Sequence, residues 1–190
     1  MNSPMPPEPN QSLIADAAKL SAYLSSGRAF DALAVLQQYE ECYADELREL
    51  VSLAIPNSEI IYLTRFDDSE LELFTTMLSN GLAADFRVGG VDYILARIMN
   101  DHNPHGVGSE GLFKLFLSFG ANPNAIALGG GTLPMLHYAV QEHANSFIEP
   151  LLRSGADARL ASESGWDAYQ MCARAKNSTA RQILDRILNG

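Results

Sequence analysis

The segments FLSFGANPNA, at residues 116–125, and LLRSGADARL, at residues 151–160, decide the fold of this chain. Each contains two apolar residues, two spacers, the pair Gly-Ala and then Asn or Asp. Between them lies LHYAV at residues 136–140, and YQMCA follows at residues 169–173, one period of 33 residues later. A repeat of this length indicates stacked copies of one small unit, each of which buries its apolar face against its neighbours.

The residues of each copy have physical roles that fit a pair of helices. Gly81, Gly120 and Gly155 each follow an apolar helical stretch, where a left-handed backbone favours a residue without a side chain. Apolar residues recur at helical spacing, at Leu112, Leu115, Phe116, Phe119, Ala180, Ile183, Leu184 and Ile187. Capping-box spacing predicts two helix starts, at Ser69 with Glu72 and at Ser146 with Glu149, and Pro150 then falls in a first turn. The pattern predicts an all-α chain.

These segments resemble the ankyrin repeat, whose consensus opens with Gly-x-Thr-Pro-Leu-His-x-Ala and ends with Leu-Leu-x-x-Gly-Ala-Asp. Leu136, His137 and Ala139 match the opening, whereas Pro134 and Met135 stand where the family has Thr and Pro. In the next copy the matching residues are Gly165, Cys172 and Ala173, while Asp167 and Gln170 replace Thr and His. A weaker copy covers MLSNGLAADF, residues 77–86, and continues to Gly89, Tyr93 and Ala96.

The resemblance implies an ankyrin-repeat solenoid, in which stacked helix pairs alternate with hairpin loops. It implies a hydrogen bond between repeats at His137, and close packing of the inner helices at Ala96, Ala139 and Ala173. The predicted organisation is a flexible arm at residues 1–11, an N-terminal helical cap or degenerate repeat at 12–57, and an array of three to four repeats at 58–190. Within the array, IIYLT after Glu59 has strand propensity, but its 33-residue step back from Tyr93 favours an inner helix.

Apolar periodicity in the cap region predicts three helices. Their faces are marked by Leu13, Ala17, Leu20 and Leu24, then by Phe30, Leu33 and Ala34, and then by Leu47, Leu50, Val51 and Ala54.

Charge is unevenly distributed along the chain. The formal net charge is −10, and the acidity is concentrated between Glu40 and Asp85. Such a field disfavours nucleic acid and anionic lipid, because phosphate binding needs a basic surface, and it would steer a basic protein partner. The alternative is that acidic helix faces only keep the protein soluble. Because we find neither a secretion signal nor a membrane-spanning stretch, we expect a cytoplasmic protein that binds no membrane, although secretion into a host stays open.

Candidate chemical sites are few, and we predict that the chain is not an enzyme and holds no metal and no cofactor. Asp101, His102 and His105 could ligate zinc, but no further ligand stands in register with them. The run of glycines at 129–131 before Thr132 lacks the Lys of a phosphate-binding loop, so a hairpin tip is expected there. Cys42 and Cys172 are expected to be buried apolar residues rather than a disulfide or a zinc site.

The resemblance places binding at the hairpin tips and at the exposed face of the inner helices. The candidate protein-binding residues are Phe86, Val88, Asp92, Ile126, Leu128, Met135, Tyr138, Leu160, Trp166 and Met171. Aromatic residues and methionine are enriched in protein interfaces. For Trp166, the only tryptophan, packing over a neighbouring loop is the alternative.

The expected function is that of a non-catalytic protein-protein interaction module, and the most specific expectation is an inhibitor or immunity-type protein that neutralises a partner such as a basic toxin or effector. A scaffold, an adaptor, a secreted effector that captures a host protein, and a metal-dependent enzyme are the alternatives, and the oligomeric state stays open.

Overall fold

A computed structural model describes residues 11–40, 44–54, 68–88, 92–100, 108–127 and 132–190. Helices make up most of these residues, and two hairpins of two-residue strands are the only regular strands among them. The expectation of an all-α chain is therefore confirmed. The segment IIYLT, for which strand and helix were both considered, lies outside the described residues, as do residues 1–10 of the predicted arm.

Three helices form one end of the molecule: α1 (Gln11–Ser25), α2 (Ala29–Glu40) and α3 (Ala44–Ala54). α1 packs against both α2 and α3, and α2 also contacts the helix that follows them, α4 (Asp68–Ser79). The apolar faces predicted for α1 and α3 are buried. The face predicted for α2 is wrong in part, because Phe30 is 76% exposed and Ala34 is exposed, and Leu33 lies instead with Ala32, Val35 and Leu36 in the core.

The rest of the chain repeats one unit, a finger followed by an inner and an outer helix. The first unit comprises β1 (Arg87–Val88), β2 (Asp92–Tyr93), α5 (Ile94–Asn100) and α6 (Gly108–Ser118). The second comprises β3 (Ile126–Ala127), β4 (Leu133–Pro134), α7 (Met135–Gln141), a short 3-10 helix (Asn145–Phe147) and α8 (Ile148–Arg153). The third comprises a finger without strands, α9 (Ala168–Ala175) and α10 (Ser178–Asn189).

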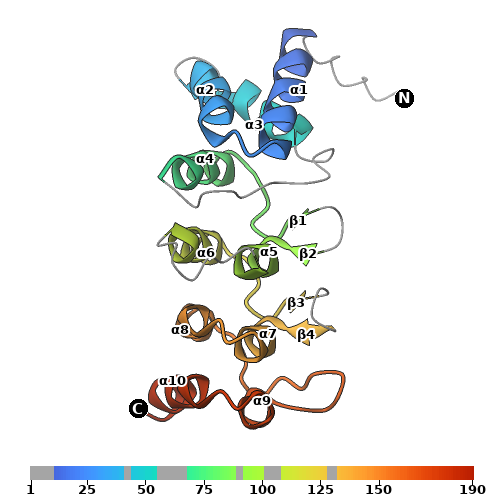
Figure 1. The fold of residues 1–190 in the computed structure, drawn as a ribbon. Coiled ribbons are helices and arrows are strands. Elements are labelled where there is room, and N and C mark those ends of the chain that lie inside the picture. The colour runs from blue at the N-terminus through green and yellow to red at the C-terminus, as the bar shows by residue number, and fades with distance from the viewer. Residues whose placement is uncertain (1–10, 41–43, 55–67, 89–91, 101–107, 128–131) are drawn as a thin grey trace, which may run out of the picture.

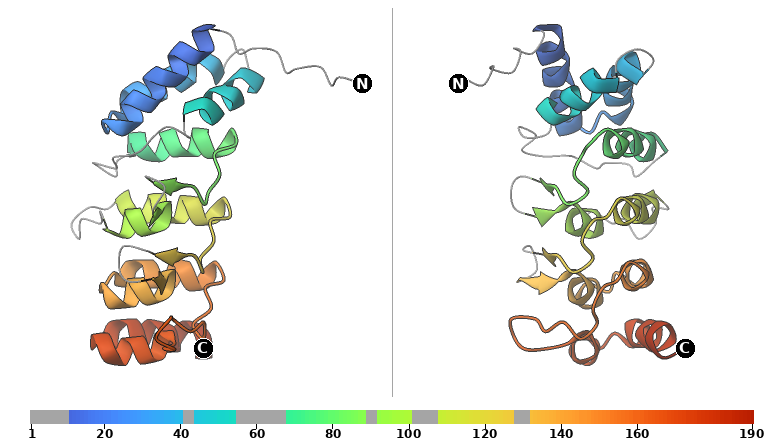
Figure 2. Two further views of the ribbon diagram at one scale, coloured as in Figure 1. Left: turned by 90° about the vertical axis from the view of Figure 1, so that its right-hand side faces the viewer. Right: turned by 180° about the vertical axis from the view of Figure 1, so that it is seen from behind.

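The units stack in two layers of helices. The outer layer runs through α4, α6, α8 and α10, each in contact with the next, and the inner layer runs through α5, α7 and α9. Figures 1 and 2 show the fingers projecting on the side of the inner helices, away from the outer layer. Both hairpins are antiparallel, with Arg87 opposite Tyr93 and Ile126 opposite Pro134. We call the side that carries the fingers and the inner helices the finger side.

Left-handed glycines end the outer helices, as the sequence predicts. The φ angles of Gly81, Gly120 and Gly155 are +100°, +92° and +94°. In each case the next residue donates its N–H to a carbonyl five residues earlier, at 2.9 to 3.0 Å, from Leu82 to Met77, from Ala121 to Phe116 and from Ala156 to Leu151. This hydrogen bond satisfies a carbonyl of the last helical turn and redirects the chain into the next finger.

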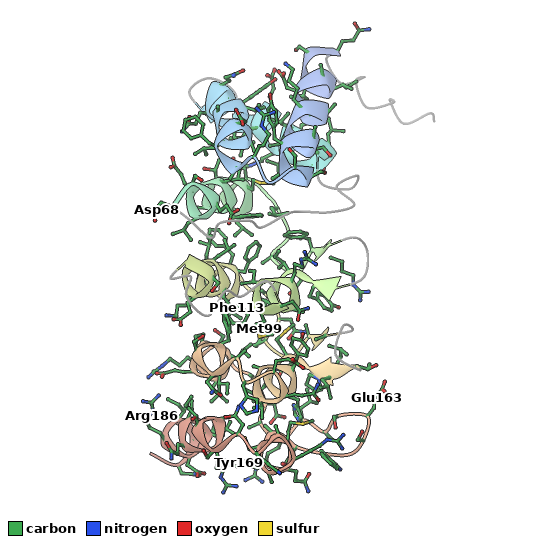
Figure 3. All side chains as sticks on the ribbon, viewed as in Figure 1. Asp68, Met99, Phe113, Glu163, Tyr169 and Arg186 are labelled. Carbon is green, nitrogen blue, oxygen red and sulfur yellow. The ribbon has the colours of Figure 1, made fainter. Side chains whose placement is uncertain are left out.

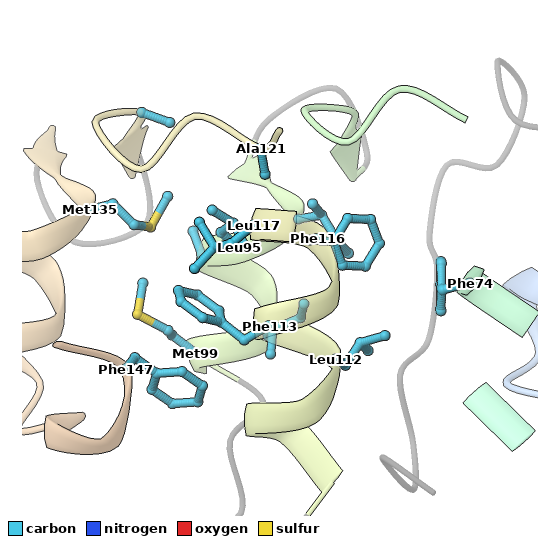
Figure 4. Packing of buried hydrophobic residues seen from close by; sticks show 14 of the residues in the cluster. Phe74, Leu95, Met99, Leu112, Phe113, Phe116, Leu117, Ala121, Met135 and Phe147 are labelled. Atoms are coloured by element: carbon cyan, nitrogen blue, oxygen red, sulfur yellow. The ribbon is translucent and has the colours of Figure 1, made fainter. Parts of the chain in front are cut away.

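Aromatic side chains connect successive layers of the stack through the core (Figure 4). The ring centroids of Phe74 and Phe116 are 5.3 Å apart, and those of Phe113 and Phe147 are 4.7 Å apart, with tilted planes. All four side chains have no exposed surface. Tilted aromatic pairs at this distance add to the free energy of apolar burial, so each unit is stabilised mainly by its neighbours.

Helix α9, rather than α8, begins with a capping box. Asp167 accepts the N–H of Gln170 at 2.8 Å, and the Gln170 side chain accepts the Asp167 N–H at 2.9 Å. The box predicted at Ser146 is wrong, because a 3-10 turn occupies that position and α8 has no side-chain cap. Glu149 pairs instead with Arg153 at 2.8 Å and with Arg186 of α10 at 2.6 Å, while Pro150 does lie in the first turn of α8.

Side chains at the base of the fingers link one unit to the next. The Asp85 carboxylate accepts the N–H of Asn122 at 2.7 Å, and the Asn124 amide oxygen accepts the N–H of Asp157 at 2.8 Å. Arg159 stands in the third unit where Asp85 and Asn124 stand in the first and second. An arginine side chain has no hydrogen-bond acceptor, so it cannot accept an N–H in the same way.

The open face of the last unit is polar where the unit before it is apolar. Val140 and Ile148 of the second unit are fully buried. The corresponding residues of the last unit, Ala173 and Arg181, lie 33 positions later and are exposed. The close packing expected at Ala173 is therefore wrong, although Ala96 and Ala139 are buried as expected. A terminal unit with a polar outer face needs no further neighbour.

Candidate protein-binding face

Each finger is closed at its base by a backbone hydrogen bond to the inner helix that follows. The first residue of each inner helix donates its N–H to a carbonyl at the start of the finger. These bonds run from Ile94 to Phe86 at 3.2 Å, from Met135 to Ala125 at 2.9 Å and from Ala168 to Ala158 at 3.0 Å. Because the same bond recurs in all three units, the fingers project in the same direction from the stack (Figure 2).

The third finger is held by hydrogen bonds around Ser162 and Trp166. The Ser162 N–H donates to the Trp166 carbonyl at 2.9 Å, and the Trp166 N–H donates to the Ser162 hydroxyl at 3.2 Å. His137 of the preceding unit also contacts this carbonyl through Nε2, at 2.9 Å. The implied hydrogen bond between repeats at His137 is therefore present, and it fixes the backbone of Trp166. Figure 3 shows Glu163 at the end of this finger.

Trp166 is half-buried and carries an arginine on its ring. Its side chain packs against the core at one edge. The guanidinium carbon of Arg174, on α9, lies 4.5 Å from the centroid of the ring. Trp166 is thus neither fully exposed nor fully covered, and its part in binding stays a prediction.

The first finger carries a similar pair. The guanidinium carbon of Arg87 lies 4.7 Å from the ring centroid of Tyr93, directly across the hairpin, and one of its terminal nitrogens donates to the Tyr93 hydroxyl at 3.1 Å. Stacking of this kind restrains a long side chain that would otherwise sample many rotamers.

The structure divides the predicted binding residues into three groups. Phe86, Ile126, Leu160 and Trp166 are partly exposed on the fingers. Val88 and Asp92 lie in strands of the first hairpin, but their side chains, like the whole of Leu128, fall outside the described part of the chain.

The third group, Met135, Tyr138 and Met171, was predicted on the exposed inner-helix face, and that prediction is wrong. Their exposed fractions are 0%, 4% and 3%. All three side chains belong to the apolar core, and Tyr138 donates its hydroxyl to the Asn100 side chain of the unit before. These positions fill the interior of the stack and cannot form a docking surface in the folded chain.

Exposed side chains gather at or just beyond the C-terminal ends of the inner helices α7 and α9. Glu142, His143 and Arg174 are exposed and Gln141 is partly exposed. The His143 Nε2 lies 3.1 Å from the Ala175 carbonyl at the end of α9, so the ends of neighbouring inner helices are in contact. One feature of the sequence could have predicted the exposure of these residues. They follow the mainly apolar runs LHYA and YQMC, at the C-terminal ends of the inner helices.

Acidic side chains are exposed at the other end of the molecule. Among the described residues, Asp45, Glu49, Asp68 and Glu72 are exposed on α3 and α4 and none of them forms an ion pair. These four acids of the field inferred from the sequence therefore lie on α3 and α4, while the third unit lies at the opposite end of the stack (Figure 1).

Two side chains that could perform chemistry, Cys172 and His137, are buried. Burial raises the pKa of the Cys172 thiol to about 11, so this cysteine is a protonated core residue, as predicted. Burial also lowers the pKa of His137 below its ordinary value of 6.5. Within the described ranges, no group of three or more His, Cys, Asp or Glu side chains could hold a metal ion. The proposed ligands Asp101, His102 and His105, the glycines at 129–131 and Cys42 lie outside those ranges.

A groove of about 470 Å³ runs between the outer helices α6 and α8, on the side away from the fingers. Its walls carry cations and anions that already pair with each other, Lys114 with Glu110 at 3.6 Å and Arg153 with Glu149 at 2.8 Å. The groove therefore offers little uncompensated charge to a ligand.

No helix in the described segments is long and apolar enough to cross a membrane. No family model matches the sequence, and a search of curated proteins finds no significant match.

Proposed function

We propose that this chain is an ankyrin-repeat protein whose finger side binds another protein, without chemistry of its own. The observation that supports this most is the recurrence, three times, of a finger, an inner helix and an outer helix joined by the same backbone bonds. An array of this kind presents a long, rigid surface made from equivalent positions of successive units, and partners bind along such surfaces.

The finger side has the composition of a binding surface. It combines half-exposed aromatic residues, Trp166 and Tyr93, with exposed arginines stacked on them. Tryptophan, tyrosine and arginine are the residue types that contribute most to binding energy in protein interfaces. Among the described groups whose pKa is shifted, His137 and Cys172 are buried, while Glu149 and Arg181 form surface ion pairs. This is the pattern of a structural protein rather than that of a catalytic cleft.

The most specific form of this proposal is an inhibitor of the immunity type, which neutralises its partner by covering it. The exposed acids of α3 and α4 would then face a basic region of that partner and accelerate association. A scaffold or adaptor uses the same surface but engages several partners.

Affinity capture with the full chain, at low and at moderate salt, tests this proposal. We expect one partner to be recovered in stoichiometric amount, and we expect the W166A variant to recover much less of it than the wild type. Recovery that decreases with salt supports the contribution of α3 and α4, because added salt screens exposed charges beyond roughly 10 Å. Equal recovery by W166A and wild type would contradict binding through the finger side, and several partners in similar amounts would favour the scaffold.

A further inference from the structure

Four arginines in the described part of the chain stack on aromatic rings, and two of them are also neutralised by a carboxylate. These two stacked arginines lie away from the fingers: Arg28, over Tyr23, lies 2.7 Å from Asp31, and Arg181, over Tyr169, lies 3.0 Å from Asp185. Stacking on a ring and pairing with an acid therefore occur together in these two cases.

The other two stacked arginines, Arg87 and Arg174, lie on the finger side and have no such carboxylate. Neither forms an ion pair with any residue that the structure describes, although both are exposed. Lys176, one residue beyond α9, and Arg159, at the base of the third finger, are likewise exposed and without an ion pair in the described residues. The third unit thus carries exposed cations without an ion pair, and the exposed acids Asp157 and Glu163 of the same unit are likewise unpaired among the described residues.

Stacking leaves the hydrogen-bonding edge of a guanidinium free. The ring covers one flat face of the group, while the N–H donors lie in its plane and point outward. Arg174 is restrained by a ring whose own backbone is held by His137 and Ser162. Less side-chain entropy is therefore lost when it binds, and its planar fork fits the two oxygens of a carboxylate.

We propose that Arg174, stacked on Trp166, binds a carboxylate from an acidic segment of the protein partner, and that Arg87 on Tyr93 binds a second acidic residue at the first finger. This inference rests on the proposed function and adds the chemistry of the segment that the finger side recognises. The contrast with Arg28 and Arg181 supports it, since Arg87 and Arg174 are stacked in the same manner but pair with no carboxylate among the described residues.

The test uses the immobilised full chain and a phage-displayed library of random peptides as the probe. We expect the wild-type chain to select peptides enriched in Asp and Glu. A synthetic copy of the strongest peptide should change the fluorescence of Trp166, which is the only tryptophan and therefore reports on this site alone. R174Q should weaken this binding by about tenfold or more, because it removes a charge-assisted hydrogen bond.

R181Q is the matched control, since Arg181 stacks on a ring in the same manner but already pairs with Asp185. We expect R181Q to bind the peptide within about twofold of the wild type, because exposed pairs contribute little. R174K, which keeps the charge and loses the fork, should bind with intermediate affinity, and circular dichroism should show all three variants folded. Selected peptides without acidic enrichment, or equal effects of R174Q and R181Q, would overturn the inference and leave the binding function standing. Failure of the wild type to select any peptide would overturn the inference alone if a partner is still captured through Trp166, and the proposed function falls only if that capture also fails.

Discussion

His137 Nε2 lies 2.9 Å from the carbonyl oxygen of Trp166, and this contact joins the second unit of the stack to the finger of the third. Because a carbonyl only accepts hydrogen bonds, Nε2 carries the proton. Nδ1 is buried with no hydrogen-bond partner in the described residues. The imidazole is therefore held in its neutral form, and the position of Trp166 on the finger side depends on it.

The burial of His137 predicts a free energy of unfolding that declines in mild acid. Burial lowers the pKa of His137 in the folded chain, while the unfolded chain binds a proton at the ordinary value of 6.5. The unfolded state therefore gains protons first, so the free energy of unfolding falls as the pH drops below about 6.5. Urea unfolding measured at several pH values should show this decline. H137Q should be less stable at neutral pH by about 1–3 kcal/mol and should show a smaller decline below it. An unchanged slope in H137Q would contradict this role.

Loss of the Phe113 ring should destabilise the stack strongly. Its ring lies 4.7 Å from that of Phe147 and has no exposed surface. F113A should lower the free energy of unfolding by about 3–5 kcal/mol, since a cavity remains where the ring was. F30A is the control, because Phe30 is 76% exposed and should change stability by less than about 0.5 kcal/mol. Similar losses in the two variants would be inconsistent with the packing described.

Two glycines should respond in opposite directions to alanine. An added Cβ would meet no atom within 4 Å at either Gly155 or Gly111, but only Gly155 has a left-handed backbone, with φ of +94°. G155A should therefore cost roughly 1–2 kcal/mol of stability through backbone strain. G111A lies within α6 and should raise stability by roughly 0.5–1 kcal/mol. Thermal unfolding of the two variants checks the sign of each change.

Asn177 should be far more sensitive to substitution than an exposed asparagine of the same unit. It is buried, accepts the N–H of Ala180 at 3.0 Å, and donates to the Val140 carbonyl at 3.0 Å and to Asn145 at 2.8 Å. N177A removes the cap of α10 and leaves a buried carbonyl with one partner fewer, so we expect a loss of about 2–3 kcal/mol. N189A, at the exposed end of the same helix, should be close to neutral in the same unfolding experiment.

Local sequence signals predicted the turns and the order of helices correctly. Gly81, Gly120 and Gly155 have the predicted left-handed conformation, because a backbone with positive φ costs glycine less than any residue with a side chain. The buried stripe of α1, including Leu13 and Leu24, also follows from periodicity alone.

The candidate site was harder to predict, because contacts between units decide which residues are exposed. Met135, Tyr138 and Met171 have side chains typical of interfaces, yet each fills space against a neighbouring unit. Ala173 was expected to be covered, but it is exposed on the open face of the unit formed by α9 and α10. Arg174 was missed because its importance arises from stacking on Trp166, eight positions earlier, across the turn into α9.

Hydrogen exchange of the backbone amides, compared between the free chain and its complex with the captured partner, tests the central claim most directly. If the finger side binds the partner, exchange should slow in the β1–β2 hairpin and at residues 158–177, and should be unchanged in the outer helices α6 and α8. Protection confined to α6 and α8, around the groove between them, with unchanged exchange at Trp166 and Arg174, would contradict the account.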